Sequence, residues 1–266
     1  MTQKPWIIGL DPWLQTPPGR YLLEWERQQF DRAVSDLFGF HAVQLGLPQL
    51  DTLACNRMPH RWVALSEASQ LDTVPEPVAG CLPVPRALVS DFEALPFDTG
   101  SLDLVVLPHT LELAQDPHQT LREVDRVLVP GGRVVIAGFN PTSLWGLRQR
   151  YGRIALRLGF GSLFLPSGGD FIGYRRLRDW LQLLSLDIEA GRFGCYRPAL
   201  RTEHWLERYA WMESAGDRWW PVFGAVYFLV AVKRVRGMRL VGPAWKTRQK
   251  PGAAPAVVAH PNKEGL

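Results

Sequence analysis

The fold is decided by residues 90–141, which read SDFEALPFDTGSLDLVVLPHTLELAQDPHQTLREVDRVLVPGGRVVIAGFNP. Residues 102–107 and 133–139 in this stretch are almost continuously apolar and have the length of strands. Between them, apolar residues recur at helical spacing over 120–128, and Pro130-Gly131-Gly132 ends that helix. Apolar strands separated by a helix are typical of a parallel sheet that helices cover on both faces.

The rest of the chain continues this alternation of helices and strands. The other predicted helices are 19–38, 145–157 and 174–186, and the other predicted strands are 40–45, 61–65, 87–89, 187–196 and 225–232. The prolines between residues 72 and 85 predict an irregular connection. We therefore expect an α/β fold with a doubly wound, Rossmann-like, mostly parallel sheet.

The composition indicates an ordinary globular protein with a different C-terminal end. The chain has 266 residues, of which 46% are hydrophobic and 21% charged. We expect a helical segment over 1–39, a main domain over 40–236 and a basic, disordered tail over 237–266. Cys55, Cys81 and Cys195 have no ligand spacing, which indicates neither disulfides nor a metal site and favours a cytoplasmic location. No segment is long and apolar enough to predict a membrane span.

Four short motifs of the central stretch carry a resemblance to a known family. They are Asp91–Phe97, Ser101–Val106, Leu121–Leu128 and Pro130–Val134. In this order they resemble the core of the class I methyltransferases that use S-adenosylmethionine (SAM), specifically the type 11 family. The resemblance implies SAM as cofactor, a seven-stranded sheet and a helical lid insertion at about 144–175.

The same resemblance, together with the fold, points to residues at two strand ends. It implies that Asp91 and Phe92, after the third strand, contact the adenine, and that Pro108 and His109, after the fourth, lie beside the cofactor. Independently of the family, doubly wound sheets bind ligands at the carboxyl ends of their strands. The alternative for Asp91 is a capping residue in a turn.

His109 is the candidate catalytic residue, and two roles are open to it. An imidazole has a pKa near neutrality and suits a general base. Methyl transfer, however, depends on aligning the nucleophile with the methyl group, which favours a positioning role. Glu112 and Asp116 either line the same cleft or cap the following helix, and we favour the cap.

The loop after the first strand departs from the family that the chain resembles. Members carry an acid followed by Gly-x-Gly-x-Gly, whereas this chain has Gln44, Gly46, Leu47 and Pro48. Glycines let a backbone approach a cofactor closely, but Leu47 adds a side chain and Pro48 lacks an N–H. The altered loop raises the question of whether SAM still binds.

The resemblance also implies an acid at the end of the second strand that holds the ribose hydroxyls, and Ser66 and, in a shifted register, Glu67 are the two candidates. The predicted cofactor site therefore consists of residues that follow the first four strands. They are Gln44, Gly46, Ser66, Glu67, Asp91, Phe92, Pro108 and His109.

A basic segment follows the fifth predicted strand of the chain, residues 133–139. It interleaves apolar residues with Arg148, Arg150, Arg153 and Arg157. This pattern fits an amphipathic helix that binds a membrane surface or nucleic acid, and equally a solvated lid helix packed on the core. Tryptophans further along are candidates for shaping the substrate pocket: Trp180, Trp205, Trp211, Trp219 and Trp220.

Two functions of different classes are compatible with these features. The first is an enzyme that transfers a methyl group from SAM to a small-molecule, lipid-like or nucleic-acid acceptor. The second is a catalytically inactive methyltransferase-fold protein that binds or regulates a partner, RNA included. Room for a cofactor at residues 46–49 favours the enzyme, whereas side chains that fill this place favour the second function.

Overall fold

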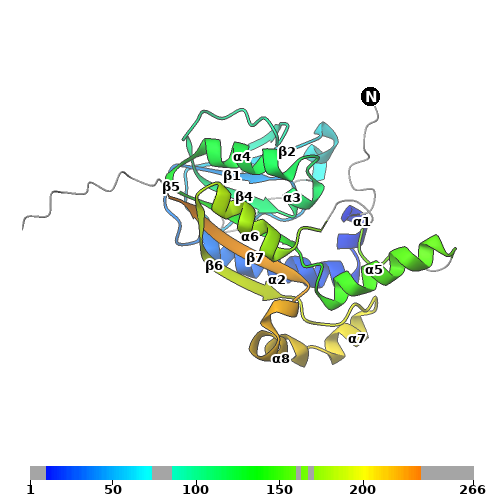
Figure 1. Ribbon diagram of the computed structural model, residues 1–266. Helices are drawn as coiled ribbons and strands as arrows, with labels where there is room; N and C mark the ends of the chain where they lie inside the picture. Colours follow the sequence, from blue (N-terminus) through cyan, green and yellow to red (C-terminus); the bar gives the residue numbers. More distant parts are fainter. Residues whose placement is uncertain (1–9, 74–85, 160–162, 167–170, 235–266) are drawn as a thin grey trace, which may run out of the picture. The chain divides into compact units, whose positions relative to one another are not determined.

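The protein is built on one seven-stranded sheet, seen in a computed structural model that describes residues 10–73, 86–159, 163–166 and 171–234 (Figure 1). The strands are β1 (His41–Leu45), β2 (His60–Leu65), β3 (Arg86–Val89), β4 (Leu102–Pro108), β5 (Leu128–Phe139), β6 (Leu186–Gly194) and β7 (Val226–Lys233). Their order is β3-β2-β1-β4-β5-β7-β6, and β7 alone runs antiparallel to its neighbours β5 and β6. The predicted doubly wound α/β fold is confirmed.

Helices cover both faces of the sheet. They are α1 (Leu10–Leu14), α2 (Pro17–Val34), α3 (Thr110–Leu113), α4 (Pro117–Val127), α5 (Leu144–Arg157), α6 (Tyr174–Leu183), α7 (Glu203–Arg208) and α8 (Trp211–Trp219), with short 3-10 turns η1 (Ala68–Thr73) and η2 (Pro221–Phe223). Residues of α1, α2 and α5 belong to the hydrophobic cluster on one face. Residues of α4 and α6 belong to the cluster on the other.

Strand β4 shows how the sequence supplies both clusters. Its Leu104 and Val106 side chains join the cluster under α2, whereas Val105 and Leu107 join the cluster under α4. Side chains alternate between the faces of a strand, so a strand covered on both faces needs apolar residues at every position. This requirement explains the continuous apolar run that predicted the strand.

Helix α2 occupies 17–34 rather than the predicted 19–38. Its start is fixed by Thr16, whose side chain accepts a hydrogen bond from the backbone N–H of Gly19. At the other end, the buried Asn56 amide donates to the carbonyls of Val34 and Leu37 at 2.9 and 3.3 Å. A residue distant in sequence therefore satisfies the free carbonyls of this helix end.

Some helices were not predicted from the sequence, and some predictions concern residues that the structure does not describe. The short helices α1, α7 and α8 were not predicted from the sequence. Most of the connection over 72–85 and the whole tail over 237–266 lie outside the described residues. Among the helices of the described part, none is long and apolar enough to cross a membrane.

Candidate functional site

Gln44 organises the loop that follows β1. Its buried side-chain amide donates to the carbonyls of Gly46, Leu47 and Leu50 at 3.0, 3.0 and 2.8 Å. Its oxygen accepts from the backbone N–H and the hydroxyl of Thr52 at 3.0 and 2.7 Å. An amide donates and accepts at once, whereas a carboxylate only accepts. Gln44, predicted to bind cofactor, is instead occupied by its own loop.

Leu47 and Pro48, the two residues that follow Gly46 in the altered loop, are both buried. Leu47 has a left-handed backbone with φ of 45°. Its side chain is buried in the cluster under α1 and α2, which also contains Leu50, and Pro48 is buried as well. The loop is therefore held by core packing on one side and by the Gln44 amide on the other.

Gly46 lies where the ends of β1 and β4 and the loop after β3 meet. Its φ of 77° falls in the left-handed region that favours glycine. A Cβ at this position would contact the Phe92 ring at 3.6 Å and the Thr110 hydroxyl at 3.7 Å. The Thr110 hydroxyl donates to the carbonyl of Leu45. Gly46 and Phe92, both predicted cofactor residues, are thus neighbours at the carboxyl edge of the sheet.

Polar side chains follow β2 and β3 at the same edge. The Ser66 hydroxyl is buried and has no hydrogen-bond partner among the described residues. Glu67 is exposed and accepts from the Ser69 hydroxyl at 3.0 Å. Asp91 is exposed, and one of its carboxylate oxygens accepts from the backbone N–H of Glu93 at 2.9 Å. The turn that was the alternative for Asp91 is therefore present, and it leaves the second oxygen for another donor.

His109 is held between two buried carboxylates. It follows Pro108, the buried last residue of β4, and has a left-handed backbone with φ of 55°. Its Nε2 lies 2.7 Å from Glu26 Oε1 of α2, and its Nδ1 lies 2.9 Å from Glu112 Oε2 of α3. The side chains of His109 and Glu26 are 1% and 0% exposed. This buried ion triad, Glu26–His109–Glu112, joins α2 to the end of β4.

The triad favours a charged imidazole. Burial alone would lower the pKa of His109, but the negative charge of Glu26 and the hydrogen bond with Glu112 outweigh it and raise this pKa to about 10. Burial also raises the pKa of Glu112, an effect that the hydrogen bond with His109 opposes. Since both ring nitrogens carry protons and face carboxylates, His109 is not placed to take a proton from a substrate. The general-base role is disfavoured, and the positioning role stays a prediction.

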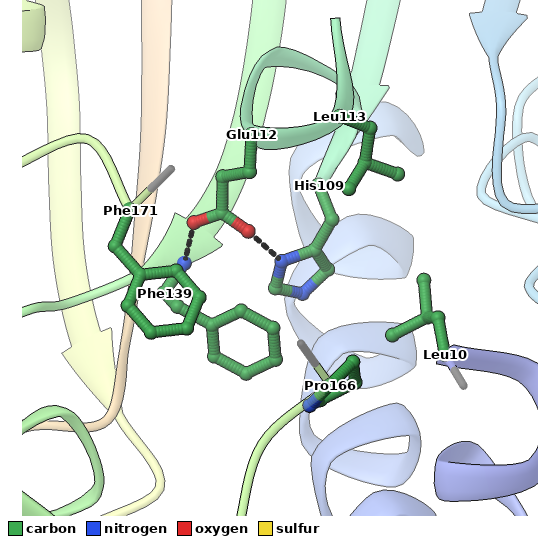
Figure 2. Close-up of a pocket in the computed structure, with 7 residues that line it drawn as sticks. All are labelled: Leu10, His109, Glu112, Leu113, Phe139, Pro166 and Phe171. Atoms are coloured by element: carbon green, nitrogen blue, oxygen red, sulfur yellow. Dashed lines mark hydrogen bonds and ion pairs between the residues drawn. The ribbon is translucent and has the colours of Figure 1, made fainter. Parts of the chain in front are cut away.

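A pocket opens beside the triad, over the ends of β4 and β5 (Figure 2). It is lined by Leu10, His109, Glu112, Leu113, Phe139, Pro166 and Phe171. Glu112 also accepts a hydrogen bond from the backbone N–H of Phe139, which fixes the carboxylate at the rim. The expected helix cap is confirmed for Asp116, which accepts from the N–H groups of His118 and Gln119 at the start of α4, and it is wrong for Glu112, which lines the pocket.

The pocket is formed by aromatic residues other than the predicted tryptophans. Phe139 and Phe171 line it and lie 5.5 Å apart between ring centroids. Four of the candidate tryptophans are instead 45–70% exposed on or beside α7 and α8: Trp205, Trp211, Trp219 and Trp220. The fifth, Trp180, contacts the His118 ring in a tilted arrangement, with 3.8 Å between the ring centroids. Glu26 was also missed, since an acidic residue within an amphipathic helix gives no sign that it is buried.

Comparisons with known proteins agree with this architecture. Residues 54–136 match the family model described as a methyltransferase domain. The uncharacterized protein YafS of Escherichia coli (strain K12) is 29% identical over 259 residues, which cover 95% of this chain and 92% of that protein. A malonyl-[acyl-carrier protein] O-methyltransferase of Halorhodospira halophila is 37% identical over 70 residues, or 26% of this chain and 24% of that enzyme.

A solved structure extends the likeness to most of the fold. A SAM-dependent methyltransferase of Thermotoga maritima has a TM-score of 0.57 at 15% identity, covering 81% of this chain and 90% of the other. The fold is therefore that of a class I methyltransferase. With the family match, it supports SAM-dependent methylation as the general activity of this chain.

The ion triad generates a stability prediction. His109→Asn leaves two buried carboxylates without their cation, so we expect the free energy of unfolding to fall by about 3–5 kcal/mol. The exposed His204 of α7 is the matched control, and His204→Asn should change it by less than about 0.5 kcal/mol. Urea unfolding measures both, and a His109→Asn variant as stable as the wild type would contradict the triad.

The same triad makes stability depend on pH. The folded pKa of His109, about 10, lies above its value in the unfolded chain, so its stabilising contribution is complete below the unfolded pKa. That contribution is lost as the pH rises toward the folded pKa. Unfolding free energies at a series of pH values from about 7 to 10 should therefore decline more steeply for the wild type than for His109→Asn. Equal slopes would contradict the raised pKa.

The Gln44 contacts predict that an acid at this position, as in the family that the chain resembles, destabilises the protein. Gln44→Glu turns a carboxylate toward three carbonyl oxygens, and the loss of the donor should cost about 1–3 kcal/mol of unfolding free energy, or more if the acid stays ionised. The control is Gln182→Glu on the exposed side of α6, which should be neutral. A Gln44→Glu variant of unchanged stability would show that the amide does not hold the loop.

Proposed function

We propose that this chain is a SAM-dependent methyltransferase whose cofactor lies across the carboxyl ends of β1 to β4 and whose acceptor enters the pocket beside His109. The observation that carries the proposal is the set of polar groups at this edge, above all the buried Ser66 hydroxyl, which has no hydrogen-bond partner in the part of the chain that the structure describes. A buried hydroxyl without a partner costs stability unless something binds it. The ribose of an adenosine offers hydroxyl partners of this kind.

The residues at this edge fit the adenosine half of the cofactor. Ser66 and Glu67 follow β2 and would hold the ribose, and the free carboxylate oxygen of Asp91 would accept from the adenine amine. Phe92 supplies an apolar ring beside Gly46, where a Cβ would lie 3.6 Å from this ring. When bound, SAM supplies an electrophilic methyl group.

The chain's own residues then position the acceptor. The rings of Phe139 and Phe171 and the side chains of Leu10 and Leu113 give the pocket apolar walls. The His109 cation, fixed from both sides, gives this pocket a rigid polar wall. An acceptor that needs no deprotonation by the protein, or that arrives ionised, suits a site in which the histidine already holds both protons. A small-molecule or lipid-like acceptor fits this mostly apolar lining.

A second function is favoured by the loop after β1. The Gln44 amide binds three carbonyls of the loop, and Leu47 and Pro48 are buried in a loop that departs from the Gly-x-Gly-x-Gly pattern. A protein that keeps the fold and binds a partner without methyl transfer would show this pattern. The two functions differ in whether SAM binds.

Calorimetric titration with SAM and with S-adenosylhomocysteine separates the two functions. We expect micromolar binding, about −8 kcal/mol. Asp91→Asn keeps an oxygen for the Glu93 N–H but loses the charge, and it should weaken binding by about 1–3 kcal/mol. Asp98→Ala, an exposed aspartate in a nearby turn, is the control and should bind normally.

Each result has a defined meaning. Absence of binding up to millimolar cofactor would overturn the enzyme and support the binding protein. Normal affinity in a folded Asp91→Asn variant would remove Asp91 from the site and leave the other contacts standing.

A further inference from the structure

Helix α5 is anchored to the body of the protein along one side. The indole N–H of Trp145 donates to the carbonyl of Arg197 at 2.8 Å. The Gln149 side chain, one turn further along, accepts from the backbone N–H of Leu165 at 2.8 Å and donates to its carbonyl at 3.0 Å. Trp145 and Gln149 are both 1% exposed. Four residues apart, they mark the inner face of the helix.

The opposite side of α5 is apolar although it faces solvent. Leu144, Leu147, Tyr151, Ile154 and Leu158 are between 46% and 69% exposed. They follow one another at spacings of three or four residues and therefore form a single stripe along the helix. We call these five residues the outer stripe. A helix that merely covers a core places polar residues on this side.

Arginines flank the outer stripe. At about 100° per residue, Arg148 falls on one side of it, and Arg150 and Arg157 fall on the other. The sequence of α5, LWGLRQRYGRIALR, contains no acidic residue. In Figure 1 the C-terminal half of the helix extends beyond the sheet. The helix thus presents apolar side chains between rows of positive charge.

We propose that the outer stripe and its flanking arginines dock α5 on the surface of a bilayer that contains anionic phospholipids. A helix with this arrangement lies in the interface, with its apolar side among the acyl chains and its cations at the headgroups. Each arginine near an anionic surface adds about 1 kcal/mol of attraction. The exposed Trp205 and Trp219 are of a residue type that favours the same interfacial depth.

Charge and polarity argue against three other binding partners for the outer stripe: a second copy of α5, the basic tail and nucleic acid. A second copy of α5 would bring arginine rows together, and like charges oppose such pairing. The tail residues Lys246, Arg248 and Lys250 are also basic and would be repelled. Nucleic acid would satisfy the arginines but leave the aliphatic residues of the outer stripe in water.

Docking would bring the proposed acceptor pocket close to lipid. The Arg153 guanidinium lies 5.8 Å from the centroid of the Phe171 ring, which lines the pocket, and Gln149 holds Leu165, whose neighbour Pro166 also lines it. A lipid-like acceptor is therefore the class that this surface favours. This last step rests on the proposed function, whereas the docking itself does not.

Vesicle sedimentation with the full chain tests the docking. The probes are vesicles of phosphatidylcholine alone and of phosphatidylcholine with an equal amount of phosphatidylglycerol. We expect at least tenfold tighter binding to the anionic vesicles. Leu147→Ser/Tyr151→Ser/Ile154→Ser should reduce this binding at least tenfold, and Arg150→Gln/Arg157→Gln should reduce it and its dependence on salt.

The matched control is Leu183→Ser, which removes a leucine that is 82% exposed on α6 and should bind vesicles like the wild type. The docking is overturned if the wild type does not bind anionic vesicles, or if the outer-stripe variant binds them as well as the wild type. Self-association or RNA binding that depends on the outer stripe, without vesicle binding, would identify another occupant and overturn it too. SAM titration of the outer-stripe variant separates these results from a failure of the cofactor site.

Discussion

A histidine cation enclosed by two carboxylates joins the parts of this protein that define its site. Glu26 comes from α2, His109 from the end of β4 and Glu112 from α3, and Glu112 also holds the backbone N–H of Phe139 at the end of β5. Buried charges are costly unless each is paired, so these elements are constrained to a single arrangement. That arrangement forms the wall of the pocket in which we place the acceptor.

The neighbouring edge of the sheet is held by the hydrogen bonds of a neutral amide rather than by buried charges. At β1 a buried amide, Gln44, fixes the loop through its carbonyls, and Leu47 and Leu50 pack beneath it. These contacts hold a loop that keeps only Gly46 of the glycines expected from the resemblance. The polar groups that remain for a cofactor are Ser66 and Asp91, after β2 and β3. The proposed enzyme thus depends on the adenosine contacts more than on the loop.

The sheet was predictable from the sequence because strands buried on both faces need nearly continuous apolar residues. Most of β4 and the second half of β5 have such runs. The triad was not predictable, because Glu26 and His109 are 83 residues apart and only the packing of α2 brings them together. The prediction that tryptophans shape the pocket relied on the tendency of large aromatic residues to lie in cores or pockets. Trp211 and Trp219 depart from this tendency, because both are exposed. The arginine pattern of α5 was visible, whereas the outward direction of its apolar stripe needed the position of Trp145.

The arrangement of the site depends most on the charge of His109, since a neutral ring would turn a lone pair instead of an N–H toward one of the two carboxylates. Nitrogen NMR of the protein labelled at its histidine rings, with His109→Asn for assignment, reads that charge directly. Both ring nitrogens of His109 should remain protonated from pH 6 to about 8, well below the folded pKa of about 10. A ring that loses a proton near pH 6.5, as an exposed histidine does, would contradict this prediction.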